Sequence, residues 1–105
     1  MLILQTTPTF WAPVKLKVPG KDKPAEFEVE FVHKSKEEMH EYMFGAQAQD
    51  RSDFDSLKEV VRGWRKVDLE FSEDNLKSLL QKYHGAARAL IEAYWVEHGN
   101  AKAGN

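Results

Sequence analysis

Two segments near the start of the sequence alternate between apolar and polar residues, which is the pattern of β-strands that bury one face. In residues 14–18 and 26–31 the apolar positions are Val14, Leu16, Val18, Phe27, Val29 and Phe31, and lysines or glutamates lie between them. Residues 19–24, PGKDKP, separate the segments and are rich in turn formers. The sequence therefore predicts an antiparallel β-hairpin with one apolar face.

The alternation also predicts a register for this hairpin. The register that satisfies both faces places Val18 opposite Phe27, Leu16 opposite Val29 and Val14 opposite Phe31. On the outer face it places Lys17 against Glu28 and Lys15 against Glu30. A slip by one residue would turn the apolar set of one strand toward water, so we expect such a slip to be disfavoured.

Helix signals follow the hairpin. Ser35 and Glu38 have the spacing of a capping box, which predicts a helix over residues 36–47. The residues expected on its inner face are Met39, Tyr42, Met43 and Ala46. Asp53 can cap a second, short helix with Phe54, Leu57 and Val61 directed inward. Gly63 is expected to end that helix, because glycine accepts the left-handed conformation that closes helices.

The stretch after Gly63 is predicted to join two helices. We expect Trp64 to be buried at the corner between the second and third helices. The connector alternates Val67, Leu69 and Phe71, and Ser72 starts a third helix with the apolar stripe Leu76, Leu79, Leu80 and Tyr83. A last helix is predicted over residues 86–98. Gly63, Trp64 and Phe71, like Val29 in the hairpin, are therefore interpreted as structural residues.

These elements fit one small domain. A chain of 105 residues is long enough for a single modest core. The expected class is α+β, with an N-terminal antiparallel β-hairpin packed against about four α-helices, because a two-stranded sheet is marginal alone. Residues 1–98 would form the domain, and the polar residues 99–105 a flexible C-terminal tail.

The residues that carry chemistry do not form a recognisable catalytic, metal or cofactor site. The sequence has no cysteine, which excludes disulfides and thiolate metal ligands. His33 and His40 are separated by a strand end and a helix start, and His84 and His98 are expected near helix ends. Gly20 and Lys21 lack the second glycine of a phosphate loop. The alternative, an enzyme that uses histidines and carboxylates, would show activity that depends on a divalent metal.

Charge and hydropathy limit the partners. A formal net charge of -2 disfavours nucleic acid, whose phosphates attract basic proteins. No apolar run approaches the roughly 20 residues that span a bilayer, so we expect no membrane partner. The first residues, MLILQTTPTF, lack the basic end and long apolar region of a signal peptide, and we expect a cytoplasmic protein.

The second half of the chain carries a family resemblance. Its landmarks are an acidic short helix, GW at 63–64, V-D-x-x-F-S at 67–72, DNLKSLLQKY at 74–83 and AARALIEAY at 86–94. This succession resembles the tail assembly chaperones of long-tailed bacteriophages, mainly over residues 53–105. One departure is His84, where the family pattern leads us to expect a proline before the final helix.

The resemblance implies a non-enzymatic protein of the host cytoplasm that keeps the tape measure protein soluble and helps to recruit tail tube protein around it. Such chaperones are absent from the finished tail, and a longer product of ribosomal frameshifting is typical of them. The alternative is a structural head-to-tail joining protein or minor tail protein, which would be found in purified virions. A phage and a prophage are equally compatible sources.

The last helix supplies the predicted partner-binding residues. Its apolar stripe consists of Ala86, Leu90, Ala93 and Tyr94, and Ile91 and Trp95 widen it beyond what one docking face covers. Either the helix is sandwiched between the hairpin and another helix, or Ile91 and Trp95 stay exposed to bind a partner. We interpret Ile91, Tyr94 and Trp95 as partner-binding residues. A homo-oligomer is also expected, because several copies of a weak site raise the avidity for a long client.

Overall fold

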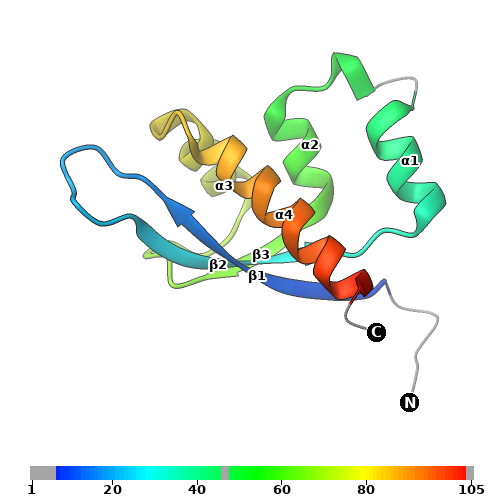
Figure 1. Ribbon diagram of the computed structural model, residues 1–105. Coiled ribbons are helices and arrows are strands. Elements are labelled where there is room, and N and C mark those ends of the chain that lie inside the picture. Colours follow the sequence, from blue (N-terminus) through cyan, green and yellow to red (C-terminus); the bar gives the residue numbers. More distant parts are fainter. Residues whose placement is uncertain (1–6, 46–47, 104–105) are drawn as a thin grey trace.

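The computed structural model describes residues 7–45 and 48–103, which form a three-stranded antiparallel sheet with helices on one of its faces (Figure 1). The strands are β1 (Thr9–Leu16), β2 (Ala25–Val32) and β3 (Val61–Arg65), in the order β1-β2-β3. The helices are α1 (Lys36–Phe44), α2 (Asp53–Val60), α3 (Glu73–Lys82) and α4 (Ala86–Ala103), with a short 3-10 helix η1 (Ala48–Asp50) between α1 and α2. The α+β class and the packing of the hairpin against helices are confirmed.

The hairpin of β1 and β2 is present, but the predicted register is wrong by four residues. Val14 lies opposite Phe27 rather than Phe31, and Ala12 takes the place opposite Val29. The strand β1 starts at Thr9 and ends at Leu16, so Val18 belongs to the connection and Phe10 pairs with Phe31. Because the shift is even, every residue that remains in a strand keeps its predicted face.

The register also changes the ion pairs on the outer face. Lys15 lies 3.8 Å from Glu26 rather than facing Glu30. Glu28 pairs with Arg65, the last residue of β3, and with Lys66, the residue that follows it, and not with Lys17. Residues from all three strands thus take part in the ion pairs of the outer face.

The third strand corrects the prediction for Gly63 and Trp64. The helix α2 ends at Val60, with Val61 as its C-cap, and the chain continues directly into β3. Gly63 therefore does not stop a helix; it pairs with Glu30 in the sheet, and Trp64 pairs with Val29. As a result Val29 lies in the central strand, with a neighbour on each side.

Trp64 is half-buried on the sheet rather than enclosed at a corner between two helices. Its ring packs edge-on against Phe71, with 5.2 Å between the ring centroids. Its indole N–H donates a hydrogen bond to the Leu69 carbonyl at 2.8 Å. Trp64 and Phe71 thus hold the connection between β3 and α3 against the sheet, which is a structural role of a different kind from the predicted one.

The helix caps follow the sequence closely. The Ser35 and Glu38 capping box is present, and Ser72 caps α3. Ser52, rather than Asp53, caps α2. The first helix ends at Phe44 with Gly45 as C-cap, so the predicted extension to residues 46–47 falls outside the described residues. The last helix continues to Ala103, beyond the predicted end at His98, and the flexibility of residues 99–105 stays a prediction.

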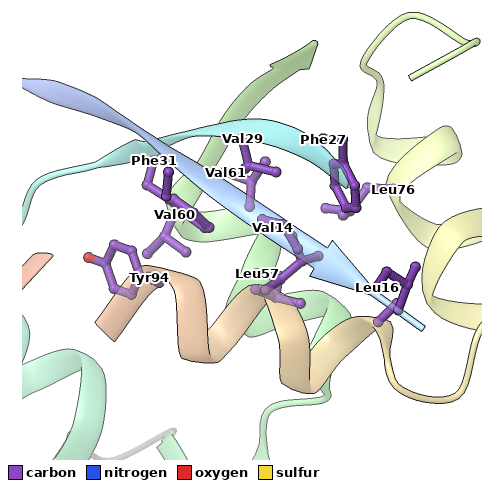
Figure 2. Packing of buried hydrophobic residues seen from close by; sticks show 13 residues of the cluster. Val14, Leu16, Phe27, Val29, Phe31, Leu57, Val60, Val61, Leu76 and Tyr94 are labelled. Carbon is purple, nitrogen blue, oxygen red and sulfur yellow. The ribbon is translucent and has the colours of Figure 1, made fainter. Parts of the chain in front are cut away.

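The core lies between the apolar face of the sheet and the helices α2, α3 and α4 (Figure 2). Figure 2 shows Tyr94 directed at the sheet beside Phe31 and Val60. The buried residues are Ala12, Val14, Leu16, Phe27, Val29, Phe31, Leu57, Val60, Val61, Leu76, Ala86, Leu90 and Tyr94. The predicted placement of Val29 in the core is confirmed, since none of its surface is exposed (0%).

Candidate partner-binding site

Three of the four histidines, His33, His40 and His98, have ring or hydrogen-bond contacts in this fold, and His84 is exposed. The rings of His33 and His98 stack, with 4.5 Å between their centroids, and His40 packs against Phe44 on α1. The Nε2 atom of His98 lies 3.3 Å from the Lys34 amide nitrogen and 3.2 Å from the Lys34 carbonyl oxygen. Within residues 7–45 and 48–103, no group of three or more histidines and carboxylates could hold a metal ion.

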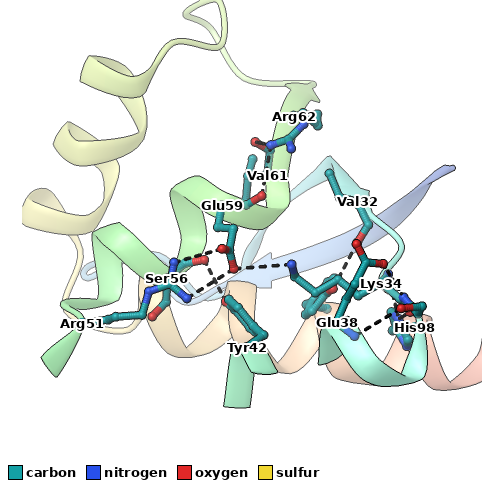
Figure 3. Close-up of polar contacts among 12 residues, drawn as sticks. Val32, Lys34, Glu38, Tyr42, Arg51, Ser56, Glu59, Val61, Arg62 and His98 are labelled. Carbon is teal, nitrogen blue, oxygen red and sulfur yellow. Dashed lines mark hydrogen bonds and ion pairs between the residues drawn. The ribbon is translucent and has the colours of Figure 1, made fainter. Parts of the chain in front are cut away.

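A polar cluster joins the end of β2 to α1 and α2 (Figure 3). Glu59 of α2 lies 3.2 Å from Arg51 and 3.5 Å from Lys34, and both cations also lie over the ring of Tyr42. The Tyr42 hydroxyl donates a hydrogen bond to the Ser56 carbonyl at 2.7 Å. Since α1 has no buried residue, this cluster is a main attachment of α1 to the domain.

The pKa shifts resolved among the described carboxyl and phenol groups run away from neutral pH. Partial burial opposes ionisation of Glu59, but the hydrogen bond from Arg51 and the charge of Lys34 hold its pKa below the ordinary value. The pKa of Glu38 is lowered by the hydrogen bond from the Ser35 amide, and that of Glu28 by Arg65. Burial raises the pKa of Tyr42 and Tyr94. Each shift reinforces the protonation state that the group already has at pH 7.

An apolar hollow of about 250 Å³ lies where α1, α2 and α4 meet. Its accessible apolar wall consists of Tyr42 and Met43 from α1 and Ile91 and Trp95 from α4, and we call these four residues the α1–α4 patch; the half-buried Ser56 of α2 also lines the hollow. Met43 is 42% exposed and Trp95 is 38% exposed, while Ile91 is half-buried. Leu57, Val60 and Tyr94 form the floor. The patch therefore presents apolar side chains on a support of core residues.

A second apolar hollow, of about 380 Å³, lies between the hairpin and α3. Trp64 and Phe27 contribute to it from the sheet, and Leu69, which is 55% exposed, contributes from the connection before α3. Trp64 is held there by its hydrogen bond to Leu69, so its ring belongs to the folded connection. The second hollow thus offers one strongly exposed apolar side chain, against two in the α1–α4 patch.

Comparison with known protein families matches residues 1–105, the whole chain, to the family described as phage tail assembly chaperone. The chain belongs to this family. No curated protein and no solved structure matches it. The resemblance seen in residues 53–105 is thereby confirmed and extended to the N-terminal hairpin.

Membership of the family implies that the partners of this tail assembly chaperone are tail proteins and that its role lies in tail assembly. Over residues 7–45 and 48–103, none of the helices of the chaperone is both long and apolar enough to cross a membrane. Because tail proteins are its partners, the exposed apolar α1–α4 patch is a candidate protein-binding surface.

The structure separates the three residues that the sequence assigns to partner binding. It brings Ile91 and Trp95 to the α1–α4 patch. Tyr94 is only 2% exposed, and its hydroxyl donates to the Val32 carbonyl at 3.1 Å, so Tyr94 supports the patch from beneath. Sequence reasoning placed Met43 on the buried face of its helix and so missed it as a patch residue. A weak signal was available, because four of the nine residues of α1 are charged, which leaves the helix a weakly amphipathic one.

Proposed function

We propose that this tail assembly chaperone binds and solubilises the tape measure protein through the α1–α4 patch and aids the assembly of tail tube protein around it. It acts in the host cytoplasm, without catalysis and without a cofactor. The observation that carries this proposal is the exposure of Met43 and Trp95 beside one another over a buried floor.

The composition of the α1–α4 patch supports a protein client. Aromatic residues and methionine are enriched at protein interfaces, and charged residues are depleted from their centres. Methionine adapts its shape to different apolar partners, while a tryptophan on a helix is a rigid anchor. A patch with both can accept apolar side chains from many positions of a long client.

One patch of this size gives weak binding, so we propose that several copies of the chaperone act together. Interfaces that bind tightly bury about 1,600 Å² in total, far more than four partly covered side chains supply. Chaperones that associate with one another along one client convert a weak contact into avidity. The homo-oligomer is therefore part of the proposal.

A double substitution in the patch tests the proposal. Ile91→Glu with Trp95→Glu places two charges in the patch and leaves the floor residues in place. The matched control is Leu69→Glu with Val96→Glu, because both residues are exposed (55% and 59%), neither lines the patch, and the change in net charge is the same. Co-expression with the tape measure protein, followed by its recovery in the soluble fraction, gives the readout.

We expect the patch variant to keep the wild-type circular dichroism spectrum and to lose most of the soluble tape measure protein, while the control keeps it. Sedimentation of each chaperone alone then shows whether self-association uses the same patch. Equal recovery with both variants would exclude the patch as the binding surface. If the patch variant unfolds, Trp95→Ser alone repeats the test, since Trp95 is partly exposed and is not part of the buried core.

The alternative, a structural head-to-tail joining or minor tail protein, makes a different prediction. A chaperone leaves the finished tail, whereas a structural protein stays in it. Mass spectrometry of purified virions distinguishes the two, and recovery of this chain at the level of known tail subunits would replace the chaperone proposal by the structural one.

A further inference from the structure

A basic groove lies at the other end of α4, between the hairpin and the turn that joins α3 to α4. Its volume is about 500 Å³, within the range of pockets that bind ligands. Its cations are Lys15, Lys17, Lys82 and Arg88, and its apolar residues include Leu16 and Tyr83. None of these six residues lines the α1–α4 patch.

The groove is positive although the chain has a formal net charge of -2. Its single carboxylate, Glu92, pairs with Arg88 at 3.1 Å, and Lys15 lies 3.8 Å from Glu26 outside the groove. Both pairs are strongly exposed and hold their partners only weakly. In the part of the chain that the structure describes, Lys17 and Lys82 have no ion-pair partner, and the Lys82 ammonium lies 5.8 Å from the Tyr83 ring centroid.

The floor of the groove is apolar. Leu16 is 5% exposed and belongs to the core, and Tyr83 and Ala89 are half-buried. A ligand that fills the groove must therefore carry apolar groups toward the floor and negative charge toward the lysines at the rim. An amphipathic protein segment with carboxylates beside its apolar stripe has this combination. A nucleic acid fits less well, because a single half-buried tyrosine offers little surface for stacking bases.

We propose that the basic groove binds an acidic amphipathic segment of a partner protein. Carboxylates of the segment pair with Lys17 and Lys82, and its apolar side chains contact Leu16 and Tyr83. The basic groove is a second interaction surface, in addition to the α1–α4 patch, and it selects partners by charge. Its attraction weakens with salt, because exposed charges are screened beyond roughly 10 Å at 0.1 M ionic strength.

The test uses defined probes and the full chain. The first probe is a fluorescein-labelled helical peptide with leucines on one face and glutamates on both sides of them. The second has glutamine in place of each glutamate, and the third is a single-stranded DNA oligonucleotide with the same total charge as the first. Fluorescence anisotropy gives the Kd of each probe at low and at high salt.

The informative variant is Lys17→Glu with Lys82→Glu, and the matched control is Lys21→Glu with Lys23→Glu. All four lysines are exposed and both variants change the net charge equally, but Lys21 and Lys23 do not line the groove. If the first variant fails to fold, Lys17→Gln with Lys82→Gln replaces it.

We expect the wild-type chain to bind the acidic peptide about tenfold more tightly than the glutamine peptide at low salt, from two screened ion pairs. Lys17→Glu with Lys82→Glu should abolish this preference, and the control should retain it. Equal affinity for the two peptides, or an equal loss in the control, would overturn the proposal. Tighter binding of the oligonucleotide that is lost in the groove variant would assign the groove to nucleic acid instead. None of these measurements uses the tape measure protein or the α1–α4 patch, so the two proposals can fail separately.

Discussion

The replacement Val29→Asp tests the placement of the central strand most directly. Val29 is fully buried in β2, between Ala12 of β1 and Trp64 of β3, and its side chain belongs to the core beneath the helices. An aspartate there removes the valine from the core and leaves a carboxyl group in an apolar environment, without a hydrogen-bond or ion-pair partner. We expect the domain to be unfolded at neutral pH.

The expected cost can be worked out in three parts. Losing the burial of valine costs about 2 kcal/mol. An unpaired, neutral carboxyl group in the core costs about 1 to 3 kcal/mol. Taking up the proton at pH 7, when the unfolded aspartate has a pKa near 3.9, costs about 4 kcal/mol more at 1.36 kcal/mol for each pH unit. The total, about 7 to 9 kcal/mol, is comparable with the whole stability of a small domain, about 5 to 15 kcal/mol.

Because the introduced aspartate takes up a proton on folding, the destabilisation by Val29→Asp depends on pH, and the direction of this dependence can be measured. Burial raises the folded-state pKa of the introduced aspartate, so in this window the folded form binds more protons and stability falls as pH rises. Between about pH 7 and pH 4 the ionisation part disappears, and about 3 to 5 kcal/mol of destabilisation remains. The Val29→Asp variant should therefore regain structure when the pH is lowered moderately, whereas the wild-type chain is already folded at pH 7.

Urea unfolding followed by circular dichroism at pH 7 and pH 4 measures both quantities. The matched control is Ala25→Asp, which introduces the same charge at an exposed position of the same strand and should change stability by less than about 0.5 kcal/mol. A wild-type urea midpoint for Val29→Asp at pH 7 would refute the packing of the central strand under the helices.

Two further substitutions probe local features. Lys66 has a φ of +66°, a left-handed conformation that costs a non-glycine residue about 1 to 2 kcal/mol, so Lys66→Gly should raise the urea midpoint, whereas Lys66→Ala should not. The pKa of Glu59 is held below its ordinary value of 4.5, because Arg51 and Lys34 outweigh its partial burial. Its stabilising contribution is present above about pH 4.5 and is lost as pH falls below it, so Glu59→Gln should lower the melting temperature at pH 7 and have a smaller effect at pH 3. A pH-independent difference would contradict the ion-pair account.

The parts of the fold that the sequence predicts correctly are those that depend on neighbouring residues. A capping box needs only Ser35 and Glu38, and the faces of β1 and β2 need only the period of two. The register depends on more, because the observed pairing of Leu16 with Ala25 and the predicted pairing of Val18 with Phe27 both leave eight residues in the connection, so the length of the connection does not distinguish them. Both registers bury the same faces, and the pattern alone cannot separate them.

The third strand was missed for a different reason. The segment VRGWR has no alternation of period two, and its glycine resembles a helix stop. It becomes a strand because it pairs with the edge of β2 that β1 leaves free, with Val29 opposite Trp64 and Glu30 opposite Gly63. A strand of five residues formed in this way is a property of the tertiary structure.

The same distinction explains why half of the α1–α4 patch was foreseen. The apolar arc of α4 is wider than one docking face, so a helical projection is enough to mark Ile91 and Trp95 as surplus. The same projection places Met43 inward with Met39 and Tyr42, yet Met43 is 42% exposed. The reason is that α1 buries no residue fully: Met39 and Tyr42 pack against the core while only partly buried, and the Tyr42 hydroxyl and the cations around Glu59 add polar contacts. A stripe shows which residues can face a neighbour, whereas exposure depends on how closely that neighbour approaches. An exposed apolar hollow built between two helices, such as the α1–α4 patch, can therefore be recognised only when both helices are in place.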